Sequence, residues 1–151
     1  MNITTRVIPL TLAAVGLAVG LGLTMATASR AKAFAEPRAT LKGVVHVNFA
    51  DAARQKQGLK NVRRILKAEP NADLEVVCHS GGLELLIKDK SEYPDEVAAL
   101  VKEGARFVAC ENSLRDKSLS SDDLIPGVGT VPSGAVEVIR KQQEGYGYFR
   151  P

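Results

Sequence analysis

From residue 41 onward, apolar and polar residues alternate in two patterns, one typical of buried strands and one of amphipathic helices. Short apolar, largely β-branched runs predict five strands, at residues 42–48, 72–80, 105–110, 127–133 and 146–149. Apolar residues at helical spacing predict helices at 51–70, 83–88, 91–104 and 133–145, with a further short turn at 121–124. Ser133 fits a helix start, and Gly104 and Gly145 fit helix ends.

Strands that alternate with helices in this way form βαβ units, and the right-handed crossovers between them make successive strands parallel. The chain is therefore expected to fold as an α/β protein with three layers, α/β/α. Its mainly parallel five-stranded sheet should carry helices on both faces. The pattern leaves the order of the strands in the sheet open.

The first 40 residues follow a different pattern. An uncharged run at 7–25 is followed by an Ala-Thr-Ala sequence that fits a signal-peptidase site. Residues 1–28 are therefore predicted to be a cleaved export signal or a retained membrane anchor, since the run falls in the spanning range of about 17 to 25 residues. Residues 29–40 are predicted to be a linker and 41–151 a single domain. The domain would then be periplasmic or held at the membrane, and a cytosolic location is the remaining alternative.

Composition and motifs exclude several classes of function. The net charge at pH 7 is only +3, basic residues are dispersed among acidic ones, and the chain has no tryptophan, so no nucleic-acid partner is predicted. The glycines at 127–134 lack the Lys-Ser/Thr of a P-loop, and neither G-x-S-x-G nor H-E-x-x-H occurs.

The residues best placed to bind a ligand or to react lie at the carboxyl ends of the predicted strands. Ligands of parallel α/β sheets bind at that edge. Four such residues end or follow strands: Asn48, Cys78, His79 and Cys110. Asn112 or Ser113 can cap the turn after Cys110, and Arg115 would add positive potential. Backbone N–H groups of such a turn stabilise a thiolate and lower the pKa of a cysteine.

Three interpretations of Cys110 remain open at this point. A nucleophile or sulfur carrier requires exposure and a lowered pKa, which the end of a strand permits. A disulfide with Cys78 requires Cα atoms within about 7 Å, and therefore neighbouring strands, in an oxidising compartment. An ordinary buried thiol requires neither condition.

A metal site is the weaker alternative. His46, Cys78, His79 and Cys110 are chemically adequate ligands for zinc or copper. However, no pair has helical i, i+4 or C-x-x-C spacing, and adjacent strand residues such as Cys78 and His79 point to opposite faces. His46 lies in the middle of a strand and is expected to be a packed or hydrogen-bonded core residue. We therefore predict no metal and no cofactor.

Several segments together resemble the DsrE/DsrF-like family over residues 41–151, namely 42–48, 59–70, 74–88, 104–114 and 124–151. The most specific parts are the C-x-N-[ST]-L sequence at 110–114 and the closing VPSGAVEVIRKQQEGYGYFRP. The resemblance implies a five-stranded α/β/α domain that commonly forms homo-oligomers. It also implies sulfur relay, in which a cysteine after a central strand carries a persulfide. Cys110 corresponds to that cysteine, and Asn112 and Ser113 match the residues that follow it.

Two functions are carried forward. In the first, Cys110 accepts sulfane sulfur from a donor protein or small molecule and passes it to a partner thiol, with Arg115 stabilising the thiolate and Cys78 able to resolve the persulfide if it is near. In the second, the domain is a non-enzymatic binding or oligomerisation module of the cell envelope. A Cys110 pKa below the free-thiol value of about 8.5 would favour the first function.

Overall fold

The computed structural model of the chain describes residues 39–151. The predicted export signal or anchor at 1–28, and most of the predicted linker at 29–40, lie outside the described residues. Ala39–Pro151 forms one compact unit. Within this unit, no helix is long and apolar enough to cross a membrane.

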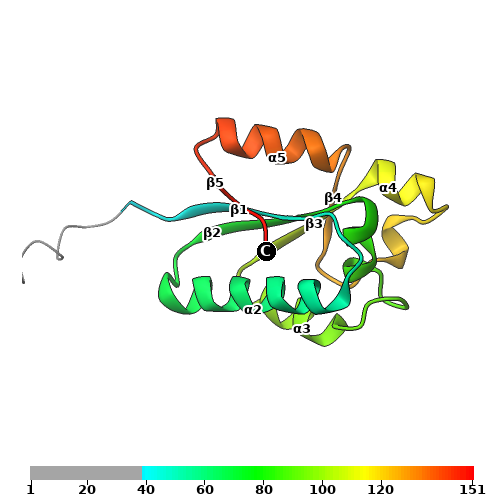
Figure 1. Ribbon diagram of the computed structural model, residues 1–151, viewed down its shortest axis with the longest axis horizontal. Coiled ribbons are helices and arrows are strands. Elements are labelled where there is room, and N and C mark those ends of the chain that lie inside the picture. The colour runs from blue at the N-terminus through cyan, green and yellow to red at the C-terminus, as the bar shows by residue number, and fades with distance from the viewer. Residues whose placement is uncertain (1–38) are drawn as a thin grey trace, which may run out of the picture. The chain divides into compact units, whose positions relative to one another are not determined.

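Strands and helices alternate along the unit (Figure 1). They are β1 (Lys42–Val47), α2 (Ala52–Ala68), β2 (Asp73–Cys78), the 3₁₀ helix η1 (Ser80–Leu86), α3 (Pro94–Lys102), β3 (Arg106–Cys110), α4 (Glu111–Asp116), the 3₁₀ turn η2 (Ser121–Asp123), β4 (Gly129–Val131), α5 (Gly134–Gln143) and β5 (Gly147–Phe149). The five predicted strands are confirmed, and the helix predicted at 83–88 is the 3₁₀ helix η1, which begins three residues earlier. Residues 111–116, which the pattern left unassigned, form α4.

All five strands are parallel, in the order β4-β3-β2-β1-β5. Helices α2 and α3 lie on one face of the sheet and α5 lies on the other (Figure 1). The predicted three-layer α/β/α fold is thus confirmed. The order places β3, which ends at Cys110, next to β2, which ends at Cys78.

The face covered by α2 and α3, here the α2/α3 face, holds the larger hydrophobic core. Asp51 starts α2 by accepting the backbone N–H of Arg54 on its carboxylate at 2.7 Å. Leu59 and Val62, one helical turn apart, are then buried against the sheet at 1% exposure each. Burying a side chain of this size contributes roughly 1.5 to 3 kcal/mol, so this face supplies most of the hydrophobic stabilisation.

The face covered by α5, here the α5 face, has a small apolar cluster and a group of buried charges. Val44 and Val77 of the sheet pack against Val138 of α5. Glu75 is 5% exposed, and its carboxylate lies 3.3 Å from Arg106 and 3.7 Å from Lys141 of α5. The apolar cluster and these ion pairs hold the helix on the sheet.

Candidate functional site

The register of the strands decides which polar residues meet at the carboxyl edge. Cys78 of β2 lies opposite Ala109 of β3, so His79 and Cys110 come next on the two strands and point to the same face. Cys78 directly precedes His79 and therefore points to the opposite face, into the core of the α2/α3 face, together with its register partner Val47. His79 and Cys110 are therefore brought together on the α5 face.

Cys110 lies at the junction between β3 and α4 and is 4% exposed. Its neutral thiol makes no capping hydrogen bond to the helix, but several donors stabilise the thiolate. Burial raises the pKa of Cys110, and this effect is outweighed by the N–H group of Gly134, the N–H and hydroxyl groups of Ser113 and the N–H group of Asn112. The net pKa of Cys110 lies below the ordinary value for cysteine.

Cys78 has the opposite environment. It is fully buried, and burial alone raises its pKa far above the ordinary value for cysteine. Both cysteines are free thiols, and the sheet lies between their side chains. Of the two, only Cys110 is held in a setting that favours the nucleophilic thiolate.

Gly134, the first residue of α5, brings a backbone N–H group to Cys110 from a distant part of the chain. A Cβ atom at this position would lie 3.0 Å from Cβ and 3.1 Å from Cδ2 of His79, and 3.3 Å from Cβ of Cys110. A Cβ atom here would force its neighbours to give by a few tenths of an ångström, so glycine suits this close approach. Ser133 lies at the predicted N-cap, but its side chain makes no capping hydrogen bond. For this donor, the signal in the sequence is a glycine in the first turn of a predicted helix.

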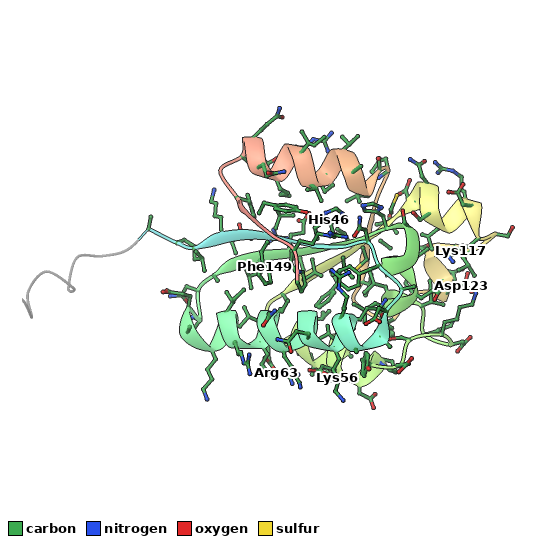
Figure 2. The ribbon with its side chains drawn as sticks, viewed as in Figure 1. His46, Lys56, Arg63, Lys117, Asp123 and Phe149 are labelled. Atoms are coloured by element: carbon green, nitrogen blue, oxygen red, sulfur yellow. The ribbon has the colours of Figure 1, made fainter. Side chains whose placement is uncertain are left out.

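Two histidines form a hydrogen-bonded pair beside the cysteine. The Nε2 atoms of His46 and His79 lie 2.7 Å apart, and the two rings are stacked with centroids 4.9 Å apart. Figure 2 shows His46 between α5 and the sheet. Burial lowers the pKa of both residues, and His79 and Arg150 lower that of His46 further. Since both pKa values lie below the usual histidine value, the pair is neutral at pH 7 and joined by one N–H···N bond.

The outer nitrogen of each histidine is also bound. His46 Nδ1 lies 2.8 Å from the hydroxyl oxygen of Tyr148 on β5, and His79 Nδ1 lies 2.9 Å from Ser80 Oγ. Ser80 in turn donates its backbone N–H to Ser113 Oγ at 2.9 Å. Sequence reasoning predicted a packed or hydrogen-bonded His46, but it did not single out Ser80 or Tyr148, whose roles depend on contacts with distant parts of the chain.

Two further residues predicted at the edge are engaged elsewhere. Asn48 Oδ1 accepts hydrogen bonds from Arg150 Nε at 3.2 Å and Nη2 at 2.9 Å. Arg115 donates to Asn112 Oδ1 and lines a surface cleft of about 230 Å³. The leading causes that lower the pKa of Cys110 are backbone N–H groups and a hydroxyl. The stabilising role predicted for Arg115 stays a prediction.

The arrangement has no described metal centre. Among residues 39–151, no group of three or more His, Cys, Asp and Glu side chains is placed to hold a metal ion. His46 and His79 instead point their Nε2 atoms at each other, within hydrogen-bonding distance.

Comparison with known proteins identifies relatives of the whole described unit. The model of the DsrE/DsrF-like family matches residues 22–151. The structure of a protein of unknown function, MTH1491 from Methanobacterium thermoautotrophicum, has 38% sequence identity and a TM-score of 0.71, and the match covers 74% of this chain and 99% of that one. The ychN protein from E. coli shares the fold, with 16% identity, a TM-score of 0.64, and coverage of 74% and 100%. No curated protein matches the chain.

Proposed function

Because the chain belongs to the DsrE/DsrF-like family, we propose that Cys110 is a sulfur carrier, which accepts sulfane sulfur from a donor and passes it to an acceptor thiol. The observation that carries this proposal is the set of donors around the sulfur: the N–H groups of Gly134, Ser113 and Asn112 and the Ser113 hydroxyl. Donors of this kind stabilise a thiolate, which is the attacking form of cysteine.

The proposed loading step conserves atoms and electrons without a cofactor. The Cys110 thiolate attacks the terminal sulfur of a persulfide R–S–SH. A new S–S bond forms between Cys110 and this sulfur, while the S–S bond of the donor breaks. The thiolate R–S⁻ leaves and takes up the proton lost from Cys110. In the transfer step, an acceptor thiolate attacks the outer sulfur of the Cys110 persulfide, and the Cys110 thiolate leaves. Each step is a thiol–persulfide exchange with no net oxidation.

Access to the sulfur restricts the donor. Cys110 is 4% exposed, so a bulky disulfide cannot approach it in line without displacing its neighbours. A persulfide can present a single terminal sulfur atom. We therefore favour small persulfides, or a persulfide at the tip of a donor protein's loop, as the sulfur source.

The loading step is tested by intact mass. Reduced protein incubated anaerobically with glutathione persulfide is expected to gain the mass of one sulfur atom. The Cys110→Ser variant should gain none, because its hydroxyl is not a nucleophile toward sulfur at neutral pH. Cys78→Ala is the matched control and should load like the wild type, since Cys78 is fully buried in the core. Equal loading of Cys110→Ser and wild type would rule out Cys110 as the carrier.

The compartment is part of the same proposal. Residues 1–28 are proposed to export the domain or anchor it at the membrane, so that the exchange takes place outside the cytoplasm. The intact mass of protein recovered from envelope fractions distinguishes a cleaved segment from a retained one. Recovery of the full-length chain in the cytosolic fraction would contradict export.

A second candidate function, assembly, is favoured by exposed apolar side chains on α5 and β5. Val136 and Ile139, three residues apart on α5, are 49% and 57% exposed. Tyr148 and Phe149 of β5 are 46% and 37% exposed. Because β5 lies at the end of the sheet, its outer N–H and C=O groups are unpaired within it. We propose that a second copy of the chain covers these residues, which makes the protein a homo-oligomer.

Assembly is tested by light scattering on the purified domain. The wild type is expected to elute as an oligomer, and a Val136→Lys/Ile139→Lys double variant as a smaller species, because two charges would be desolvated at the contact. A matched Lys56→Glu variant changes an exposed charge on α2, on the opposite face of the sheet, and should leave the mass unchanged. A monomeric wild type at micromolar concentration would contradict this second function.

A further inference from the structure

A continuous set of contacts leads from the histidine pair to the sulfur of Cys110. His79 holds Ser80 through Nδ1 and Oγ, at 2.9 Å. Ser80 gives its N–H to Ser113 Oγ, also at 2.9 Å, and Ser113 stabilises the Cys110 thiolate through both its N–H and its hydroxyl. No member of this set is a charged side chain at neutral pH, so its effect on the cysteine depends on geometry.

Ser80 is the strained member of the set. Its φ is +52°, in the left-handed region that residues other than glycine rarely occupy. For such residues the conformation is unfavourable and is kept only when neighbouring contacts fix it. Here the contact between the Ser80 hydroxyl and His79 fixes it. The same conformation aims the Ser80 N–H at Ser113.

The direction of the Ser113 hydroxyl follows from this contact. A serine oxygen has one proton to donate and lone pairs to accept with. Since the Ser80 N–H already donates to Ser113 Oγ, that side of the oxygen acts as an acceptor, and its own proton is free for the sulfur. Ser113 is 8% exposed, so little water competes for that proton.

We propose that His79 is a positioning residue for Cys110: it fixes the conformation of Ser80, whose N–H turns the Ser113 hydroxyl toward the sulfur. The role concerns the reactivity of the carrier cysteine and so rests on the proposed function. Both nitrogens of His79 are engaged by His46 and Ser80, so neither is free to bond the reacting sulfur atoms.

His46 and Tyr148 extend this set of hydrogen bonds outward from His79. Tyr148 can donate its O–H to His46 Nδ1, His46 Nε2–H then donates to His79 Nε2, and His79 Nδ1–H donates to Ser80 Oγ. In this arrangement each ring nitrogen has a partner. The positive charge of Arg150 opposes protonation of His46.

The positioning role is tested by the pKa of Cys110, measured from the rate of iodoacetamide alkylation against pH. Ser113→Ala removes the hydroxyl and is expected to raise this pKa by about one unit, which means roughly tenfold less thiolate at neutral pH. His79→Phe keeps a ring beside Gly134 but removes both nitrogens, and should raise the pKa in the same direction. The double variant should show no larger shift than Ser113→Ala alone, because both changes act through one hydroxyl.

If His79→Phe does not fold, variants of Ser80 test the same link between His79 and the pKa of Cys110. Ser80→Ala should also raise the pKa of Cys110, whereas Ser80→Gly, which adopts the left-handed conformation freely, should raise it less. Circular dichroism and thermal unfolding confirm the fold of each variant. A wild-type pKa in His79→Phe or Ser80→Ala, or additive shifts in the double variant, would overturn the positioning role. The measurement needs no sulfur donor, so it can succeed or fail independently of sulfur loading.

Discussion

The Gly82→Ala variant is expected to unfold far more easily than the wild type, with a loss of about 3 kcal/mol or more in the free energy of unfolding, the upper end of overpacking costs. A Cβ atom at Gly82 would lie 2.1 Å from the carbonyl oxygen and 2.5 Å from the carbonyl carbon of Val47, and 3.0 Å from the backbone nitrogen of Asn48. These are backbone atoms at the end of β1, which cannot move aside as a flexible side chain can.

Gly82→Ala should also disturb the surroundings of Cys110. The Gly82 N–H donates to the His79 carbonyl at 2.9 Å, and the His79 N–H donates to the Val47 carbonyl at 3.2 Å. A shift of η1 away from β1 would therefore move His79 and, with it, Ser80. Any folded Gly82→Ala protein should show slower alkylation of Cys110.

Urea unfolding followed by circular dichroism measures the effect of Gly82→Ala. Gly129→Ala is the matched control, because the nearest atoms to its new Cβ lie at 3.7 and 3.8 Å, which is ordinary contact. That variant should stay within about 0.5 kcal/mol of the wild type. Equal stability of the two variants would contradict the close contact between Gly82 of η1 and the backbone of β1.

The Gly134→Ala variant is expected to raise the pKa of Cys110 by about one unit and to slow its alkylation at neutral pH roughly tenfold. The added methyl group would lie 3.0 Å from Cβ of His79 and 3.3 Å from Cβ of Cys110, so we expect the first turn of α5 to shift outward by a few tenths of an ångström. Its N–H would then bind the sulfur less well. Losing a hydrogen bond to a charged group outright costs about 1.5 to 3 kcal/mol, or roughly one to two pKa units, so weakening this one should give a shift at the lower end.

Ser133→Ala is the control for Gly134→Ala. It changes the neighbouring residue, whose side chain makes no capping hydrogen bond, and should leave both stability and the pKa of Cys110 close to wild type. Alkylation of Gly134→Ala at the wild-type rate, in a protein with an intact fold, would contradict the role of the Gly134 N–H.

The fold could be predicted from the sequence because apolar residues recur at the spacing of a helix or a strand in each element. Leu59, Val62 and Leu66 mark the buried side of α2, and the apolar runs mark each strand. The order β4-β3-β2-β1-β5 could not be predicted, since alternation shows which residues of one strand share a face and says nothing about neighbouring strands. For the same reason the pairing of His46 with His79 was not foreseen.

The site could be predicted only in part. Cys110 was identified because it ends a strand and matches the family's cysteine, and Asn112 and Ser113 do lie among its donors. The donor from Gly134 depends on the close approach of α5, which comes from elsewhere in the chain. Arg115 donates a hydrogen bond to Asn112, and its predicted effect on the thiolate stays a prediction.

Sulfur transfer through Cys110 is tested most directly by following a labelled atom. Protein loaded anaerobically with a persulfide whose outer sulfur is a heavy isotope is divided in two; one half is alkylated and digested, and the other first receives an excess of a small thiol. We expect the label on the peptide that contains Cys110 in the first half, and on the added thiol in the second. Label on Cys78, or label that stays on the protein despite excess thiol, would contradict a carrier role for Cys110.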